Sequence, residues 1–279
     1  MSLEAFTELA GGLDHPEGIA WGLDGFLYAG GEAGQVYRIG LDGSVEEIAS
    51  TSGFIYGLAV DSGANVYACD FGNAGVARVG PAGEVSVYSQ GTDARPMRVP
   101  NAAAFDDAGT LFVTDSGEWG DDDGTIFRIA AGGATEVWTD AAPAFPNGCC
   151  LSLDGDALLV IESRARRIVR VPFADDGGAG VPETVVELLG SQPDGLALAA
   201  DGTIIVGCYR PDRLWLIPPE GEPRVLAEDP DGVVLNQPAN PCFVGADLDR
   251  LAVSSLGGWS IMWADLGLAG APLRYPTIQ

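Results

Sequence analysis

Residues 15–48 read HPEGIAWGLDGFLYAGGEAGQVYRIGLDGSVEEI, and residues 55–88 read IYGLAVDSGANVYACDFGNAGVARVGPAGEVSVY. Both stretches follow one order: an apolar strand, a Gly- or Asp-rich turn, a second strand, a variable loop and two more short strands. Alternating apolar and polar residues separated by hairpin-length turns are typical of antiparallel β-structure. Four short strands in about 40 residues is the length of one β-propeller blade.

Four further copies of this unit account for nearly all of the remaining chain. They span residues 99–138, 145–188, 192–226 and 237–266. The last copy lacks a fourth strand, and we expect EAFTELA, residues 4–10, to supply it and close the ring so that no sheet edge stays exposed. The sequence therefore predicts an all-β, six-bladed β-propeller with four antiparallel strands per blade, as a single domain over residues 1–279. A β-sandwich or two barrels would not explain six copies of one unit.

The charge balance is strongly acidic, which limits the partners that the protein can bind. Forty acidic residues face fourteen basic ones, for a net charge of −26. A field of this sign repels phosphate backbones and anionic membranes, so we expect no nucleic-acid or membrane partner. No stretch approaches the roughly 18 apolar residues of a membrane helix, and we find no signal peptide at the N-terminus. We expect a monomer or weak homo-oligomer.

Residue usage also excludes large classes of enzyme chemistry. All fourteen basic residues are arginine, so no lysine can form a Schiff base. His15 is the only histidine, so a Ser-His-Asp or Cys-His arrangement could form only around it. Five cysteines without C-x-x-C spacing indicate reduced, mostly buried thiols in a cytoplasmic protein.

The residues at the start of each unit's first strand are the candidates for chemistry. Since the first strand of a propeller blade lines the channel, equivalent positions face one another across the axis. Four of the six positions carry an oxygen-bearing side chain, namely Glu17, Asn101, Asn147 and Asp194. Together they predict a site for one hard or borderline divalent cation. Asn or Asp between Pro and Gly is also an ordinary turn former, but four donors at one register, one of them a glutamate, favour the metal.

Four motifs carry a resemblance to a known family. HPEGIAW (15–21), RVPNAAAFDDAGTLFVTDSG (98–117), FPNGCCLSLDGDALLV (145–160) and QPDGLALAADGTIIV (192–206) resemble the SMP-30/gluconolactonase family. The resemblance implies a six-bladed propeller with one catalytic divalent metal (Ca²⁺, Zn²⁺, Mn²⁺ or Fe²⁺), and many members hydrolyse sugar lactones. The family's metal ligands fall on Glu17, Asn147 and Asp194, with Asn101 as a softer fourth ligand.

One stretch departs from the family pattern. Sugar lactonases of the family often show an R-P-N-D type stretch, with Arg two residues before Asn and Asp directly after it. Here Arg98 lies three residues before Asn101, and Ala102 follows. This sequence therefore has an arginine near the position that would hold a polyhydroxylated sugar, but not at the spacing that the family shows.

The predicted function is a metal-dependent lactonase that acts on a small cyclic ester. The metal would polarise the lactone carbonyl and stabilise the oxyanion. By resemblance, Asp194, or Glu17 as second choice, accepts the proton of the attacking water. Because the loop after each second strand surrounds the same channel mouth, we expect substrate contacts from Trp119, Arg164 and Tyr209. By resemblance to the family's arginine, we also expect one from Arg98.

Two alternatives keep the metal but change its use. One is hydrolysis of phosphotriesters at the same site. The other is a non-catalytic binding propeller in which the cation only ties the blades together. Relatives of strictosidine synthase share the fold, but Glu17, Asn147 and Asp194 together favour the metal site.

Overall fold

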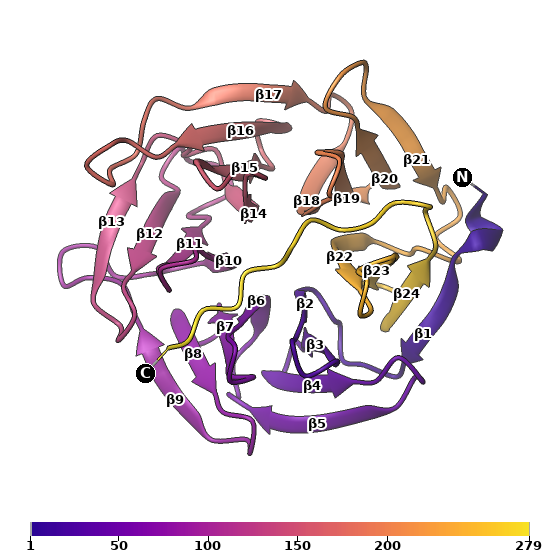
Figure 1. Ribbon diagram of the computed structural model, residues 1–279, viewed down its shortest axis with the longest axis horizontal. Coiled ribbons are helices and arrows are strands. Elements are labelled where there is room, and N and C mark those ends of the chain that lie inside the picture. Colours follow the sequence, from indigo (N-terminus) through magenta and orange to yellow (C-terminus); the bar gives the residue numbers. More distant parts are fainter. Residues whose placement is uncertain (1, 279) are drawn as a thin grey trace.

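Six four-stranded antiparallel sheets stand radially around a central channel in the computed structural model, which describes residues 2–278 (Figure 1). This confirms the predicted six-bladed β-propeller. In blades 1–5 the strands follow one another from the channel outward, so each blade is a simple meander. The ends of the predicted domain, residues 1 and 279, lie outside the described part.

The strands of the six blades have the following bounds. Blade 1 contains β2 (Ile19–Trp21), β3 (Leu27–Gly30), β4 (Gln35–Ile39) and β5 (Val45–Ser50). Blade 2 contains β6 (Ile55–Val60), β7 (Val66–Asp70), β8 (Gly75–Val79) and β9 (Val85–Ser89). Blade 3 contains β10 (Pro100–Phe105), β11 (Leu111–Asp115), β12 (Thr125–Ile129) and β13 (Thr135–Thr139). Blade 4 contains β14 (Pro146–Leu151), β15 (Ala157–Glu162), β16 (Arg167–Pro172) and β17 (Glu183–Glu187). Blade 5 contains β18 (Gln192–Leu198), β19 (Ile204–Arg210), β20 (Asp212–Ile217) and β21 (Arg224–Glu228). Blade 6 contains β22 (Pro238–Val244), β23 (Arg250–Ser255), β24 (Ser260–Ala264) and, from the N-terminus, β1 (Thr7–Gly11).

The N-terminal strand closes the ring as predicted. β1 pairs antiparallel with β24 and supplies the outer strand of blade 6. It begins at Thr7 rather than residue 4, because Leu3–Ala5 form a short 3₁₀ helix, η1. The Ser2 hydroxyl caps this helix by accepting a hydrogen bond from the Glu4 amide at 3.3 Å.

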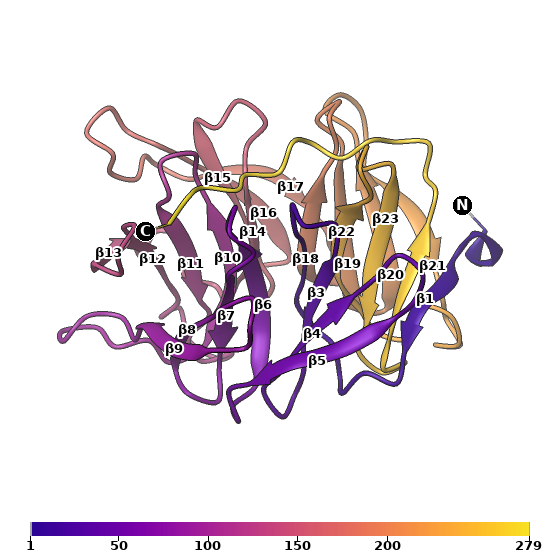
Figure 2. The same cartoon turned by 60° about the horizontal axis from the view of Figure 1, so that its bottom comes forward.

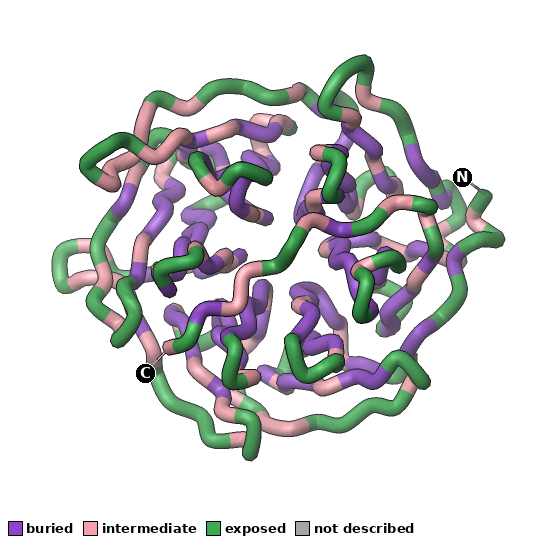
Figure 3. The backbone as a smooth tube through the Cα atoms, in the orientation of Figure 1, coloured by how far each residue is buried: buried purple, intermediate pink, exposed green. Residues whose placement is uncertain are grey.

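The core lies between the blades. Figure 3 shows buried chain around the channel and exposed chain along the outer edge. β7, β11 and β15 are buried along their whole lengths. Their sequences therefore run nearly continuously apolar, unlike the predicted alternation, because each blade packs against a neighbour on both faces. Tyr67 of blade 2, for example, meets Phe105 of blade 3 edge-on at 5.0 Å.

A C-terminal segment, residues 266–278, crosses one end of the channel, and we call it the strap (Figures 1 and 2). The sequence pattern made no prediction for it. The Ala271 amide donates to the Leu198 carbonyl, and the Tyr275 hydroxyl donates to the Trp21 carbonyl at 2.7 Å. The Ser62 amide then donates to the Pro276 carbonyl, so the strap bonds to blades 5, 1 and 2 in turn. These anchors lie at or just beyond the ends of the first strands, opposite the predicted ligands.

Beneath the strap, the channel widens into a cavity of about 490 Å³ lined by first-strand residues and residues 271–275. Within residues 2–278, no helix is long and apolar enough to cross a membrane.

Candidate functional site

The side chains of Glu17, Asn101, Asn147 and Asp194, which we call the oxygen ring, come from blades 1, 3, 4 and 5 and are buried. They lie at the starts of the first strands, at the end of the channel that we call the ring mouth. Each first strand of blades 2–6 breaks its register with the second strand near this position; in blade 4 the break lies between Pro146 and Cys149. Such bulges locally re-aim side chains, and here they recur at the position that the repeat alignment identified.

Hydroxyl groups near the ends of the second strands donate hydrogen bonds to the ring backbone of the neighbouring blade. Each bond ties the second strand of one blade to the start of the first strand of the next blade. The bonds run from Thr114 Oγ1 to the Asn147 carbonyl (2.8 Å), from Ser163 Oγ to the Pro193 carbonyl (2.6 Å) and from Ser254 Oγ to the Glu17 carbonyl (2.6 Å). The sequence analysis missed these residues, although each lies at or just after the end of a second strand, in V-T-D-S-G, I-E-S-R or V-S-S-L-G.

Burial destabilises the charged form of both ring carboxylates. Burial raises the pKa of Glu17 well above its usual value, and the negative charge of Asp194 raises it further. Burial also raises the pKa of Asp194 to about 7, although a hydrogen bond from the Asn147 amide opposes that shift. The site therefore favours a cation or a proton between these groups.

Two buried oxygens of the ring lack a hydrogen-bond partner in the described structure. They are Asn147 Oδ1 and Asp194 Oδ1. Buried polar atoms are nearly always satisfied, so an orphaned pair on adjacent blades indicates a ligand. Within residues 2–278, no three His, Cys, Asp or Glu side chains gather into a metal site. The ring has two carboxylates only, and a cation there would need the amide oxygens of Asn101 and Asn147 as well. This all-oxygen donor set fits a hard divalent cation.

Two tyrosines complete the surroundings of the ring. Tyr56 occupies the ring position of blade 2, and burial followed by the charges of Glu17 and Asp194 raises the pKa of its phenol. Burial, then Asp194 and Glu17, raises the pKa of Tyr209 to about 12. Both phenols thus lie within electrostatic reach of the carboxylates and stay protonated hydrogen-bond donors at neutral pH.

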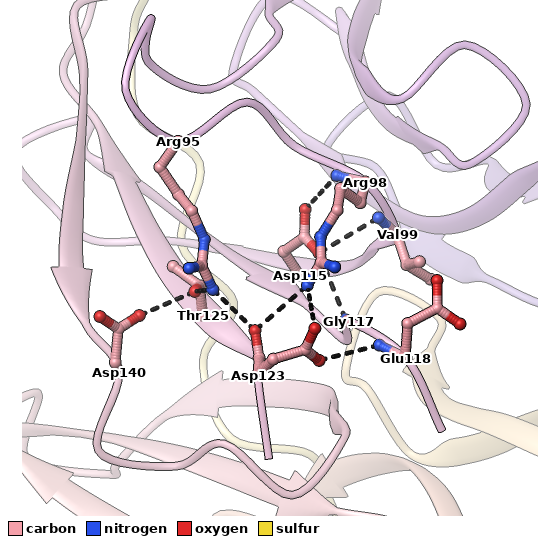
Figure 4. A network of polar contacts seen from close by, with 9 residues as sticks. All are labelled: Arg95, Arg98, Val99, Asp115, Gly117, Glu118, Asp123, Thr125 and Asp140. Atoms are coloured by element: carbon pink, nitrogen blue, oxygen red, sulfur yellow. Dashed lines mark hydrogen bonds and ion pairs between the residues drawn. The ribbon is translucent and has the colours of Figure 1, made fainter. Parts of the chain in front are cut away.

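Arg98, three residues before Asn101, lies in a network of polar contacts (Figure 4). Its backbone amide donates to Asp115 at 2.6 Å, and its guanidinium donates to Asp123 at 2.6 Å. Asp123 in turn accepts from the Glu118 amide at 2.9 Å. The arginine therefore ties the acidic loop 118–123 to the chain just before Asn101.

The other predicted substrate contacts also lie around the ring mouth. Arg164 forms an ion pair with Asp122 of the same acidic loop. Trp119 is 42% exposed and packs edge-on against Phe145 with ring centroids 4.8 Å apart. With Tyr209 beside the ring, all four residues lie on the side of the ring mouth formed by blades 3, 4 and 5. Their contact with substrate stays a prediction.

His15 has a local partner. Its Nδ1 lies 2.8 Å from a carboxylate oxygen of Glu32, which follows the second strand of blade 1. The pair borders the ring mouth beside Glu17.

Fold and site together define a six-bladed propeller with an oxygen-donor centre at one mouth of its channel. Residues 16–257 match the model of the SMP-30/gluconolactonase/LRE-like region, and the chain belongs to this family. The resemblance carried by the four sequence motifs is thus confirmed.

Relatives of known sequence are more distant. The chain is 28% identical over 151 residues to the protein strictosidine synthase-like 3 of Arabidopsis thaliana, a match covering 49% of this chain and 38% of that protein. It is 26% identical over 138 residues to a "Putative sugar lactone lactonase" of Rhizobium meliloti (strain 1021), covering 47% of this chain and 44% of the relative. The matches span less than half the length of either relative.

Solved structures support the fold over almost the whole chain. A gluconolactonase from Xanthomonas campestris superposes with a TM-score of 0.80 at 19% identity, covering 94% of this chain and 89% of that one. The calcium-binding protein regucalcin from Agrobacterium tumefaciens gives 0.73 at 17% identity, covering 95% and 93%. At such identities the likeness shows the fold alone.

Proposed function

We propose that the protein is a divalent-metal-dependent lactonase that opens a small cyclic ester at the ring mouth. The observation that carries the proposal is the oxygen ring. Its two carboxylates and two amides are all buried at the same register of the repeat, and two of their oxygens have no hydrogen-bond partner. Membership of the SMP-30/gluconolactonase family supports lactone hydrolysis as the reaction.

Glu17, Asn101, Asn147 and Asp194 would hold the cation, which when bound supplies Lewis-acid polarisation of an ester carbonyl. Ca²⁺, Zn²⁺, Mn²⁺ and Fe²⁺ all remain candidates. The two carboxylates offset the ion's charge, and the two amides add oxygen donors without further repulsion. Burial of all four side chains excludes bulk water from competing for these positions.

Asp194 is our candidate for the general base. Its carboxylate accepts a proton from the attacking water as the new carbon–oxygen bond forms. The carbon–oxygen bond that closes the lactone then breaks. The departing alkoxide takes up a proton, and the product is a hydroxy acid. The nearby phenol of Tyr209, protonated at neutral pH, is placed to donate hydrogen bonds to substrate oxygens. Glu17 is the second candidate base.

Asp194→Asn tests the base separately from the ligand role, because an amide keeps an oxygen donor but cannot accept the proton. General base catalysis contributes about 10²–10⁴-fold. We expect a loss of that size in kcat at saturating metal, whereas Asp121→Asn, which changes an exposed carboxylate of the mouth, should stay near the wild-type rate. Undiminished hydrolysis by Asp194→Asn would rule out its assignment as base.

Chelation with a panel of substrates tests the reaction itself. Proton release by the hydroxy-acid product serves as the measure of lactone opening. We expect this hydrolysis to stop when the metal is chelated and to return when the metal is added back. Turnover of phosphotriesters but not lactones would support the phosphotriesterase alternative. Bound metal without turnover of either would support a binding propeller.

A further inference from the structure

Aromatic side chains of blade 2 form a continuous stack at the ring mouth. Tyr56 and Phe71 lie nearly parallel, with ring centroids 5.1 Å apart and 3° between their planes. Phe54 meets Tyr56 edge-on at 4.7 Å and Phe71 at 6.2 Å. Phe71 is 39% exposed, so the stack ends in an apolar face that is open to solvent.

This stack reaches the oxygen ring at its inner end. Tyr56 occupies the ring position of its blade, next to Gly18 of blade 1: a Cβ on Gly18 would lie 2.2 Å from the Tyr56 carbonyl oxygen. Its phenol is within electrostatic reach of Glu17 and Asp194. A molecule bound at the ring can therefore also touch the stack.

Aromatic residues on other blades extend this surface around the mouth. Trp119 packs on Phe145, two residues before Asn147. Trp259 is 53% exposed and lies 6.4 Å from the ring of His15, two residues before Glu17. Three large apolar side chains with exposed faces, Phe71, Trp119 and Trp259, thus lie near the approaches to one polar centre, whereas soluble proteins usually scatter such residues singly.

The two arginines expected to bind substrate are already engaged. Arg98 donates to Asp123 and Arg164 pairs with Asp122, both within the acidic loop 118–123. Their charge is offset by carboxylates, and the rest of the chain carries a large negative excess. Neither guanidinium group is therefore free to hold a carboxylate or hydroxyl group of a substrate.

We propose that the mouth selects lactones that carry a flat, apolar, uncharged substituent over hydroxylated sugar lactones. The substituent stacks on the open face of Phe71 while the ester group reaches the oxygen ring. Trp119, in the loop between β11 and β12 of blade 3, contacts it from the neighbouring blade. This specificity rests on the proposed lactonase function.

The test compares two δ-lactones that differ only in one substituent, phenyl or hydroxymethyl. The wild-type protein should hydrolyse the phenyl lactone with at least a tenfold higher kcat/KM. Burying an aromatic group contributes roughly 10- to 100-fold, so Phe71→Ala should lower kcat/KM for the phenyl lactone by that factor more than for the hydroxymethyl lactone. Phe71→Tyr should retain the preference. Val87→Ala, which truncates a 70% exposed side chain on the outer strand β9, should leave it unchanged.

A preference of the wild-type protein for the hydroxymethyl lactone would overturn the proposal. Equal losses for both lactones in Phe71→Ala would do the same.

Binding of the matching lactams, which resist hydrolysis, separates this proposal from the lactonase function. Calorimetry should show tighter binding of the phenyl lactam and a selective loss in Phe71→Ala and Trp119→Ala. If neither lactone is hydrolysed but this pattern holds, the lactonase function fails and the apolar recognition surface stands. If the two lactams bind equally, the recognition surface is wrong whatever the outcome for catalysis.

Discussion

Glu17 and Asp194 bring two negative charges into a buried place where neither can be solvated. Their pKa values rise because burial disfavours the charged form, and Glu17 rises further beside Asp194. Such a pair costs stability in the folded protein unless a proton or a cation lies nearby. The two carboxylates that would bind a cation therefore lower the free energy of unfolding when no cation is bound.

This pair predicts an inverted pH dependence of stability in chelator-treated protein. Asp194 has an ordinary pKa near 3.8 in the unfolded chain and about 7 in the folded one, so the folded state binds more protons between these values. The stability that this group contributes is fully present below pH 4 and is lost as pH rises through 7, by on the order of 4 kcal/mol. Urea unfolding at pH 4.5, 6 and 8 measures how the free energy of unfolding changes over this range.

Asp194→Asn is the control for that experiment, because the large acidic excess also favours lower pH. The variant keeps the global charge effect and Glu17 but loses the titration of Asp194, so its stability should fall less between pH 4.5 and 8. Identical slopes for both proteins would show that the ring carboxylate does not titrate as described.

At the scale of the element, bulged first strands and close contacts between blades position the ring. Gly148 follows Asn147 in the bulge of β14 and faces the backbone of blade 5. A Cβ at this position would lie 2.6 Å from the Asp194 carbonyl oxygen and 2.7 Å from Gly195 Cα. Glycine is required here because any side chain would collide with the backbone at Asp194 and Gly195. Its lack of a Cβ lets the backbones of blades 4 and 5 approach closely beside Asn147.

Gly148→Ala should therefore loosen the contact between blades 4 and 5. We expect a loss of about 1–3 kcal/mol in the free energy of unfolding, the usual cost of overpacking. Affinity for the divalent cation should also fall, because Asn147 and Asp194 move apart. Gly120→Ala is the matched control, because this glycine is exposed and a Cβ added to it would meet no heavy atom within 4 Å. Equal stability of the two variants would mean that the bulge can relax freely.

Local sequence predicted the ring register but not the contacts around it. Proline before each ring residue except Tyr56, and the apolar run after it, marked six equivalent positions. The pairing of Arg98 with Asp123 depends on how a loop 25 residues away folds back. The bond from Thr114 to the Asn147 carbonyl spans 33 residues and two blades. Neither follows from strand periodicity, because that pattern reports which face is buried and not which polar groups meet.

On the scale of the whole molecule, the strap ties together blades that are far apart in sequence. Tyr275 and its acceptor Trp21 are 254 residues apart. The repeat pattern predicted the blades and the closing strand β1, since each repeats one unit. The strap is not part of the repeat and contains no regular strand or helix. Its course therefore depends on the surface of the folded propeller, which the repeat pattern does not describe.

Removing one anchor should release the strap locally. Tyr275→Phe deletes the hydrogen bond to the Trp21 carbonyl, which we expect to cost about 1 kcal/mol. Hydrogen exchange should become faster at the amides of Ala271 and Ser62, which bond across the strap. Tyr88→Phe deletes a comparable hydroxyl bond to the Ala130 carbonyl on the outer edge and should leave these amides protected. Unchanged protection in Tyr275→Phe would show that the strap does not depend on this anchor.

Metal stoichiometry of the purified protein tests the oxygen ring most directly. Elemental analysis, with calorimetric titration of the chelator-treated protein, should find one divalent cation per chain. The double variant Asn147→Ala/Asp194→Ala should lose it, whereas Asp121→Asn should keep it. A wild-type protein that binds no stoichiometric cation, or a double variant that binds it equally well, would contradict the assignment of the ring as a metal site.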